Sequence, residues 1–467
     1  MPINSFLYPG AKVVPPFTVA NSCRFDDGSS DSMNRSNGTP TNLKKFSISL
    51  WFKRPEPGLN KYLITGYDDE NNRTLLQFSS DQLLFQNATG GSNNTVVKSN
   101  AVFRDPSAWY HFCVIVDTTQ STDSNRVKMY VNGSQITSLA SSTYPNQNTD
   151  MELTDSANSI ILNQKGDNSD YNSGYYAEVV VLDGTAASIT DFGQFNEDTP
   201  TVWEPKDVTG LTFGNNGFYL DFEDSSNLGN DASGGTDFTV SNLTALDQST
   251  DTCSNNFATM NPLTNGDIQY SEGNLKGVKA SGDGTLKMWG STFAVSNGKW
   301  YWEIKNNLNS TSNWYVGITD VENVARSLTS RFPGIDATGY GLRGSDGNKM
   351  NNNSASSYGN SNTNGDIIMI ALDLDNNKIW FGENGTFFNS GDPASGSNEA
   401  FTVTSGLFYM PTFAATGGGG EGWIANFGSP SFSISSGNSD GNGHGNFEYS
   451  VPSGYYAINS KNLAEFG

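Results

Sequence analysis

The sequence predicts an all-β protein made of two antiparallel β-sandwiches in tandem, and three observations lead to that fold class. Short apolar runs alternate with clusters of Gly, Asn, Asp and Ser, and only residues 188–195 carry a helical pattern. A hairpin pattern at 365–387 recurs in a looser form at 109–133. The 467 residues are enough for more than one hydrophobic core without disulfide cross-links.

The repeated hairpin defines the unit from which the chain is built. In the copy at 365–387, two apolar runs flank the polar turn 375–377, and a second turn follows at 383–385. In the copy at 109–133, an apolar strand also ends in Asp, and the returning strand begins with a basic residue and ends in Asn-Gly. The same order of features in both halves indicates one β-module used twice.

The first half of the chain is predicted to form an arm, a domain and a linker. Prolines keep the arm at 1–22 out of a helix, and its apolar side chains need a surface, either on its own first domain or on another chain. Residues 23–237 form the first domain, and 238–265, rich in Asn, Thr, Asp and Ser, are predicted to be a linker. Strand patterns in the domain lie at 46–53, 75–78, 83–86, 109–117, 126–133, 175–182 and 217–222.

The second half repeats this organisation. Residues 266–430 are predicted to form the second domain, and 431–467 a C-terminal tail that begins with a stretch rich in Gly, Ser and Asn. Strands at this spacing, without alternating helices, favour antiparallel sandwiches. The strand patterns lie at 298–304, 314–318, 339–342, 365–387, 407–413 and 423–428.

Composition restricts the partners and the compartment. The formal charge of −22, from 48 acidic and 26 basic residues, repels phosphate backbones and argues against nucleic acid. No apolar run is long enough to span a membrane, and the N-terminus lacks the basic region of a signal peptide. The three cysteines, Cys23, Cys113 and Cys253, favour free thiols made in a reducing cytoplasm, although a Cys23–Cys253 pair stays open.

Two families resemble the two domains. The second domain resembles the SPRY family through 298–303, 316–318, 339–341, 365–373, Pro411 and 426–428. The first resembles the laminin-G-like and concanavalin A-like lectin group through 46–52, 109–111 with Asp117, 128–133 and 176–178. Both families share one jelly-roll architecture, so the resemblance implies two concanavalin A-like antiparallel β-sandwiches in tandem.

The tandem as a whole, with 24–28 near its start and 255–262 at its junction, resembles virion proteins of tailed bacteriophages that infect marine bacteria. This resemblance implies a non-enzymatic, tail fibre-like protein on the virion surface, in the tail or capsid, made in the host cytoplasm. Its partners would be other virion proteins, further copies of itself and a host-surface glycan or protein. An architectural part, such as a capsid decoration or fibre-attachment protein, is the alternative, and a polysaccharide-degrading enzyme a distant third. Phe6, Leu7 and Tyr8 of the arm would attach it to the virion.

Sugar recognition would need an aromatic platform and hydrogen-bonding groups, because a pyranose presents an apolar face and a rim of hydroxyls. Loop tyrosines are the candidates, although each could equally pack against its own loop. They are Tyr67, Tyr144, Tyr171 and Tyr358.

Calcium is the one cofactor for which the loops offer suitable chemistry, since Ca²⁺ takes six to eight oxygen ligands. Asp167, Asn168 and Asp170 supply carboxylate and amide oxygens in one short loop. The order of an EF-hand is absent there, so a solvated turn is the competing interpretation.

Catalytic signatures are weak throughout. Glycosidases of this fold use carboxylates at alternate positions of one strand, and no such run is present. Glu178 and Asp183 lie an odd number of residues apart and are expected on opposite faces. Residues 437–441 match a nucleophile-elbow pattern near His444, but in a loop rather than between strand and helix. His111, in an apolar strand, is expected to be a packed residue, and we therefore expect no enzyme.

Overall fold

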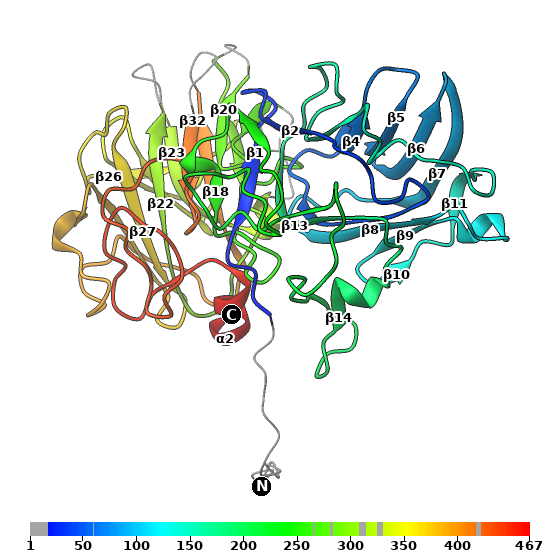
Figure 1. Ribbon diagram of the computed structural model, residues 1–467. Coiled ribbons are helices and arrows are strands. Elements are labelled where there is room, and N and C mark those ends of the chain that lie inside the picture. The colour runs from blue at the N-terminus through cyan, green and yellow to red at the C-terminus, as the bar shows by residue number, and fades with distance from the viewer. Residues whose placement is uncertain are drawn as a thin grey trace, which may run out of the picture.

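The computed structural model describes residues 17–58, 60–264, 267–280, 284–307, 314–324, 330–416 and 422–467. It shows two β-sandwiches side by side (Figure 1). The α-helices of the described residues are α1 (Val321–Val324) and α2 (Ser460–Phe466). The predicted fold class, all-β with two antiparallel sandwiches, is confirmed. None of the helices in these ranges has the length and apolarity needed to span a bilayer.

The first sandwich packs two eight-stranded sheets face to face. Alternate residues of β3, namely Phe46, Ile48, Leu50 and Phe52, enter the shared core, whereas Ser47, Ser49 and Trp51 face away from it. One sheet has the order β10 (Ser134–Gln135), β9 (Val127–Val131), β8 (Trp109–Asp117), β3 (Lys45–Lys53), β13 (Gly174–Asp183), β1 (Ser22–Phe25) and β18 (Gln248–Ser249), with β16 (Phe218–Leu220) also on β13. The other has the order β11 (Leu139–Thr143), β7 (Ser92–Val102), β6 (Gln82–Thr89), β5 (Arg73–Ser79), β4 (Lys61–Tyr67), β12 (Ser159–Leu162), β2 (Ser32–Ser36) and β17 (Thr239–Ser241).

The outer face of the β3–β13 sheet carries a second apolar layer. The segment predicted to be helical is a single 3₁₀ turn, η2 (Ile189–Asp191), capped by Ser188. After it, the hairpin of β14 (Gly193–Phe195) and β15 (Trp203–Pro205) projects from the sandwich (Figure 1). Trp203 anchors this hairpin because its indole N–H donates to His111 Nδ1 at 3.1 Å.

The second sandwich packs a nine-stranded sheet on a six-stranded one around a core rich in tryptophan. The larger sheet has the order β19 (Ile268–Ser271), β20 (Lys276–Lys279), β32 (Gly422–Asn426), β22 (Lys299–Asn307), β27 (Ile367–Asp373), β28 (Lys378–Glu383) and β29 (Thr386–Phe387), with β30 (Phe401–Thr402) on β28 and β33 (Tyr456–Ala457) on β22. The smaller has the order β21 (Lys287–Gly290), β31 (Tyr409–Ala415), β23 (Trp314–Asp320), β24 (Gly339–Arg343), β25 (Lys349–Asn351) and β26 (Ser354–Ser356).

Both predicted hairpins are present. β27 pairs with β28 so that Asp373 lies opposite Lys378, and Asn377 takes the positive φ that the tight turn requires. β8 pairs with β9, with Val116 opposite Val127. The repeated pattern in the sequence therefore corresponds to the same local structure in both sandwiches.

The ends of the domains differ from the sequence-based expectation. Residues 238–265, expected to be a linker, contribute β17 and β18 to the two sheets of the first sandwich. In the expected tail, the backbone N–H groups of Glu448 and Tyr449 donate to the buried carboxylate of Glu303 at 2.9 and 2.8 Å. Composition could not show these pairings because they are long-range. The arm residues Phe6, Leu7 and Tyr8 lie outside the described residues.

A buried joint holds the two sandwiches together. Lys53 of β3 donates to Asp251 Oδ2 at 2.7 Å and to the Phe257 carbonyl at 3.0 Å. The turn between β19 and β20 of the second sandwich also packs against the first sandwich. There the Tyr175 hydroxyl donates to the carbonyl of Gly273 at 3.0 Å. A Cβ at Gly273 would lie 2.4 Å from the Tyr175 ring, so this close approach requires glycine.

Candidate ligand-binding site

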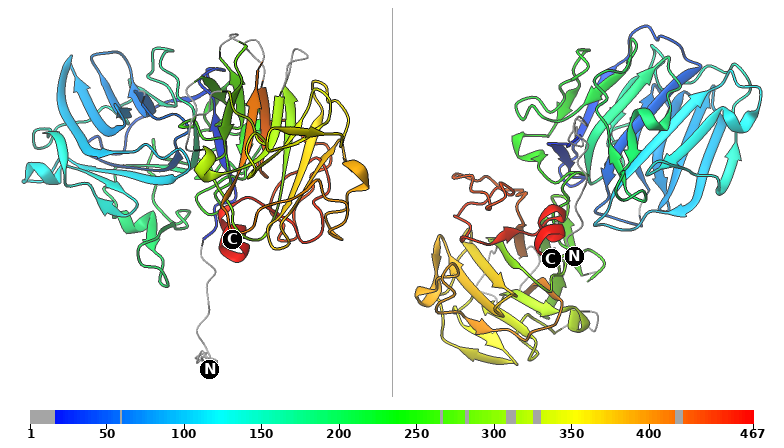
Figure 2. Two further views of the ribbon diagram at one scale, coloured as in Figure 1. Left: turned by 180° about the vertical axis from the view of Figure 1, so that it is seen from behind. Right: turned by 90° about the horizontal axis from the view of Figure 1, so that it is seen from below.

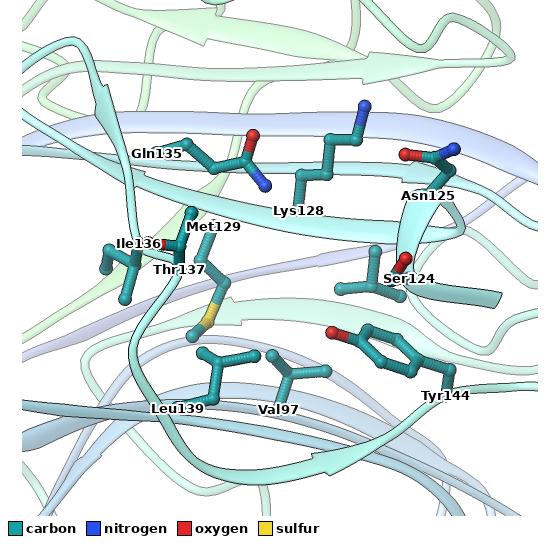
Figure 3. A pocket seen from close by; sticks show the side chains of 11 residues that line it. Val97, Ser124, Asn125, Lys128, Met129, Gln135, Ile136, Thr137, Leu139 and Tyr144 are labelled. Atoms are coloured by element: carbon teal, nitrogen blue, oxygen red, sulfur yellow. The ribbon is translucent and has the colours of Figure 1, made fainter. Parts of the chain in front are cut away.

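A pocket of ≈ 290 Å³ opens at the free edge of the first sandwich, and we call it the edge pocket (Figure 3). It forms where the chain leaves one sheet after β10 and enters the other at β11, so the two sheets are not closed by a common strand. Its lining residues are Val97, Ser124, Asn125, Val127, Lys128, Met129, Gln135, Ile136, Thr137, Leu139 and Tyr144.

The inner wall of the edge pocket is the open end of the hydrophobic core. Val97 and Met129 are buried core residues, and Leu139 and Tyr144 pack against that core while remaining partly exposed. Figure 3 shows the Tyr144 ring across from Met129, with its hydroxyl directed into the pocket. Burial, followed by the nearby Asp123 carboxylate, raises the Tyr144 pKa, so this hydroxyl keeps its proton and can donate.

Arg126 fixes the loops beside the pocket. Its guanidinium donates to the carbonyls of Gln120, Ser121 and Pro145 at 2.9, 2.9 and 2.8 Å. These bonds hold Pro145, and with it the neighbouring Tyr144, against the turn that leads into β9. On the opposite rim, the Ile136 N–H donates to the Met129 carbonyl at 2.8 Å. The pocket is thus held by the Arg126 side chain on one side and by a backbone hydrogen bond on the other.

The lining combines an apolar wall with hydroxyl and amide groups and the ammonium of Lys128. None of the eleven lining residues is an aspartate, glutamate, histidine or cysteine. Such a surface suits a ligand that has an apolar face and a polar rim. It offers no pair of carboxylates for glycoside hydrolysis.

Of the four tyrosines predicted as ligand contacts, Tyr144 lines the edge pocket and the other three make internal contacts. Gly166 covers Tyr67, since a Cβ there would lie 2.3 Å from the Tyr67 ring. The Tyr171 hydroxyl accepts from Gln164 Nε2 at 2.9 Å. Tyr358 lies edge-on to the rings of Phe381 and Phe388 in the second sandwich.

The loop predicted to bind calcium lies beside Tyr67 and Tyr171, and its oxygens are engaged internally. Lys165 contacts both Asp167, at 3.3 Å, and Glu70, at 2.7 Å. Ser169 also donates to Asp167, and this bond is the main cause of the lowered Asp167 pKa. Gln164 Nε2 donates to Asn168 Oδ1 at 3.1 Å. These contacts use acceptors that Asp167 and Asn168 would offer to Ca²⁺, while the Asp170 side chain is exposed.

No described group of three or more His, Cys, Asp or Glu side chains is placed to hold a metal ion. The three cysteines are free thiols.

The isolated histidine of the first sandwich is packed between aromatic rings. His111 lies 5.0 Å from the Trp51 ring centroid and 5.9 Å from that of Trp203. Since Nδ1 accepts from Trp203, Nε2 carries the proton and donates to Ser49 Oγ at 2.8 Å. Burial lowers the His111 pKa to about 3, which keeps the ring neutral. Ser49 Oγ therefore accepts a hydrogen bond from His111, whereas an activated nucleophile would donate one to the histidine.

The other residues weighed for catalysis also have structural partners. Asp183 accepts from the backbone N–H groups of Thr41 and Asn216 at 2.7 and 3.1 Å, and Glu178 accepts from the Tyr219 hydroxyl. Residues 437–441 lie in a loop, where Asn438 bridges to Phe447, without the preceding strand and following helix of a nucleophile elbow.

A comparison with known families matches each of the two sandwiches to a domain family. The family model described as the concanavalin A-like lectin/glucanases superfamily matches residues 27–188, and the SPRY domain model matches residues 299–429. The chain carries a concanavalin A-like domain followed by a SPRY domain. The edge pocket lies within the matched part of the concanavalin A-like domain. A search of curated proteins found no match to this chain.

Several solved structures are similar to parts of this chain at low identity. The SPRY domain of human HERC1 is 19% identical, with a TM-score of 0.29, and covers 36% of this chain and 96% of its own. A heptameric SAP-like pentraxin from Limulus polyphemus is 14% identical, with a TM-score of 0.28, and covers 37% of this chain and 80% of its own. A putative carbohydrate binding protein from Bacteroides ovatus is 15% identical, with a TM-score of 0.32, covering 48% and 59%.

The apolar walls of the edge pocket, Val97, Met129 and Leu139, were not predicted as site residues. In the sequence they are ordinary apolar strand positions. The opening between the sheets exists only because residues 136–138 cross from one sheet to the other, and no local pattern marks that crossing.

Proposed function

We propose that this protein is a non-enzymatic binding protein whose concanavalin A-like domain takes a saccharide unit in the edge pocket. The observation that carries the proposal is the combination of an apolar wall, the inward Tyr144 hydroxyl and amide groups in a pocket without carboxylates. An apolar sugar face would pack on Met129 and Leu139, and ring hydroxyls would bond to Tyr144 and the rim.

We propose further that this binding serves recognition of a host surface by a bacteriophage virion. The support is the resemblance of the tandem to phage virion proteins at 24–28 and 255–262. In this setting the protein is a tail fibre-like surface component, and its arm, with Phe6, Leu7 and Tyr8, attaches it to the particle. When the protein is made without residues 1–16, it should then no longer be incorporated into particles. Immunoblotting of purified virions should therefore fail to detect it.

An architectural role is the second candidate, and the β14–β15 hairpin favours it. This hairpin presents Phe195 and Val202 at 43% and 49% exposure, which suits a contact with another virion protein. The two roles are separable. Purified protein that binds host cells and blocks infection supports recognition, whereas a deletion that weakens particles but leaves adsorption intact supports architecture.

The recognition proposal is tested by substituting Tyr144 and measuring binding to an array of neutral and acidic oligosaccharides. Tyr144→Ala should weaken the best-bound glycan at least about tenfold, which corresponds to about 1.4 kcal/mol. Tyr144→Phe should have a smaller effect, because it keeps the ring and loses only the hydroxyl. Phe195→Ala, at a distant exposed aromatic, serves as the control. If Tyr144→Ala and the wild type bound the glycan equally well, the edge pocket would not be the binding site.

A further inference from the structure

A groove lies between the two sandwiches, and we call it the joint groove. It is made up of two adjacent hollows of ≈ 270 and ≈ 210 Å³, and Thr250 lines both of them. Residues 18–21 and 250–252 form one wall, and 429–434 with 443–446 form the other. Figures 1 and 2 show the segment that leads into β1 running between the sandwiches, close to α2.

The walls of the joint groove are fixed in the absence of a ligand. On one side, the Val19 N–H donates to Ser254 Oγ at 3.0 Å, and the Val19 carbonyl accepts from Thr252 Oγ1 at 3.1 Å. The hydroxyls of Ser249 and Ser429 are hydrogen-bonded at 2.7 Å and tie the two walls together. The opposite wall is held where the Asn446 N–H donates to the Gly428 carbonyl at 2.8 Å. A preformed groove loses little free energy to reorganisation when it binds.

Some polar side chains of the groove are free to bind, whereas those of Gln248, Thr252 and Ser429 are already hydrogen-bonded. Asn21, Thr250, Ser433 and Asn446 have no hydrogen-bonding partner for their side chains among the residues that the structure describes. Pro430, Phe432 and Ile434 add an apolar strip between them. Amides and hydroxyls on both sides of such a strip match a chain of sugar rings, which alternates apolar faces with hydroxyls.

The charge of the lining and the hydrogen bonds of its backbone favour an oligosaccharide over other polymers as the ligand of the joint groove. The hollow at Asn21 has no charged lining residue, and the hollow at Thr18 contains Lys461, which forms no ion pair within the described ranges. The net charge of −22 repels a polymer with the charge density of nucleic acid, about one phosphate per 1.7 Å of duplex, more strongly than a polymer with a single carboxylate on each sugar ring. A peptide strand could not add along Val19, because its N–H and carbonyl are already bonded.

We propose that the joint groove binds a linear acidic oligosaccharide, with its sugar hydroxyls on Asn21, Thr250 and Asn446 and a carboxylate at Lys461. Both domains contribute to this site, which neither sandwich could form alone. It is separate from the edge pocket and does not depend on the function proposed for that pocket. A ligand that engaged both sites would be held at two points of the same chain.

Titration calorimetry on the full chain tests the proposal with two probes, a guluronate hexamer and cellohexaose. The Tyr144→Ala variant weakens binding at the edge pocket and serves as the parent, so that the difference between each groove variant and this parent reports on the groove. In that background the hexauronate should bind more tightly than cellohexaose. Asn446→Asp should weaken hexauronate binding at least about tenfold through charge repulsion and a lost amide donor. Lys461→Gln should weaken the hexauronate and leave cellohexaose unchanged.

Lys98→Gln is the charge-matched control, since Lys98 lies on β7 of the first sandwich, and it should change neither probe. Asn446 and Lys461 are exposed, and thermal unfolding of each variant checks that it is folded. Equal hexauronate binding by Asn446→Asp and its parent would overturn the proposal, as would a preference for cellohexaose. Binding gained only when residues 1–16 are removed would assign the groove to the chain's own N-terminal segment and would also overturn it.

Discussion

Glu178 is the most strongly perturbed carboxyl among the residues that were weighed for catalysis. It occupies a bulge of β13, where the register with β3 shifts between Ala177 and Val180, and its φ of 50° is unusual for a glutamate. Its side chain is 5% exposed and accepts from the Tyr219 hydroxyl at 2.7 Å. Burial, followed by the negative charges of Asp221, Glu223 and Asp207, raises the Glu178 pKa to about 8.

We expect Glu178→Gln to flatten the pH dependence of stability. A raised pKa means that the folded protein binds the proton more tightly than the unfolded chain does, so wild-type stability falls as the pH rises from about 4.5 to about 8. Glutamine keeps the acceptor for Tyr219 and carries no charge. Urea unfolding at pH 5.5 and 8.5 should show a loss in the wild type that exceeds the loss in the variant by at least about 1.4 kcal/mol.

Glu322, an exposed glutamate of α1 in the second sandwich, provides the control for this comparison. Glu322→Gln should keep the wild-type pH dependence. Identical pH dependence in Glu178→Gln and the wild type would contradict a raised Glu178 pKa.

At the level of single residues, the sequence identified which side chains have the chemistry to bind a sugar, but not which of them face a pocket. Tyr67, Tyr144, Tyr171 and Tyr358 were equivalent candidates as loop aromatics. The structure distinguishes them because Gly166 covers Tyr67, whereas the crossing at 136–138 leaves Tyr144 facing an open pocket. Side-chain surroundings of this kind depend on contacts between segments far apart in the chain.

Among the elements, the β14–β15 hairpin depends on one side chain. Trp203 is 7% exposed and packs beside His111, whereas Phe195 lies edge-on to Trp203 near the hairpin end. The rest of the hairpin makes few apolar contacts with the sandwich, since Phe195 and Val202 are exposed.

Trp203→Ala should therefore detach the hairpin while the sandwiches remain folded. Removal of a buried tryptophan costs about 3–5 kcal/mol when the site cannot collapse. Limited proteolysis should reveal new cleavage at 196–202, with far-ultraviolet circular dichroism largely retained. Phe195→Ala should leave the proteolytic pattern unchanged. Cleavage at equal rates in Trp203→Ala and the wild type would show that another contact holds the hairpin.

For the whole molecule, the decisive feature is the joint between the concanavalin A-like and SPRY domains. Lys53 and Asp251 are each about 1% exposed, and Asp251 also accepts from Trp109 Nε1 at 3.0 Å. Arg24 of β1 contacts Glu272 of the second sandwich at 3.4 Å. These contacts join the domains into one body, and we expect a single cooperative unfolding transition.

Lys53→Met should separate this transition into two. Without the ammonium, the Asp251 carboxylate is buried without a countercharge, which costs about 3–5 kcal/mol. Differential scanning calorimetry should then resolve the two sandwiches. Lys44→Met is the matched control, because Lys44 pairs with Asp150 at 2.6 Å on the surface and should cost no more than about 1 kcal/mol. A single transition in Lys53→Met, displaced no further than in Lys44→Met, would contradict the joint.

By itself, the sequence determined the fold class and the two hairpins, because both depend on local features. The alternation of apolar and polar residues defines strands, and the turn residues at 375–377 define where the chain reverses. Only the tertiary structure decided that 238–265 adds strands to both sheets of the first sandwich, that Tyr144 faces a pocket, and that Lys53 meets Asp251. These features bring together residues far apart in the chain, and no local periodicity records such contacts.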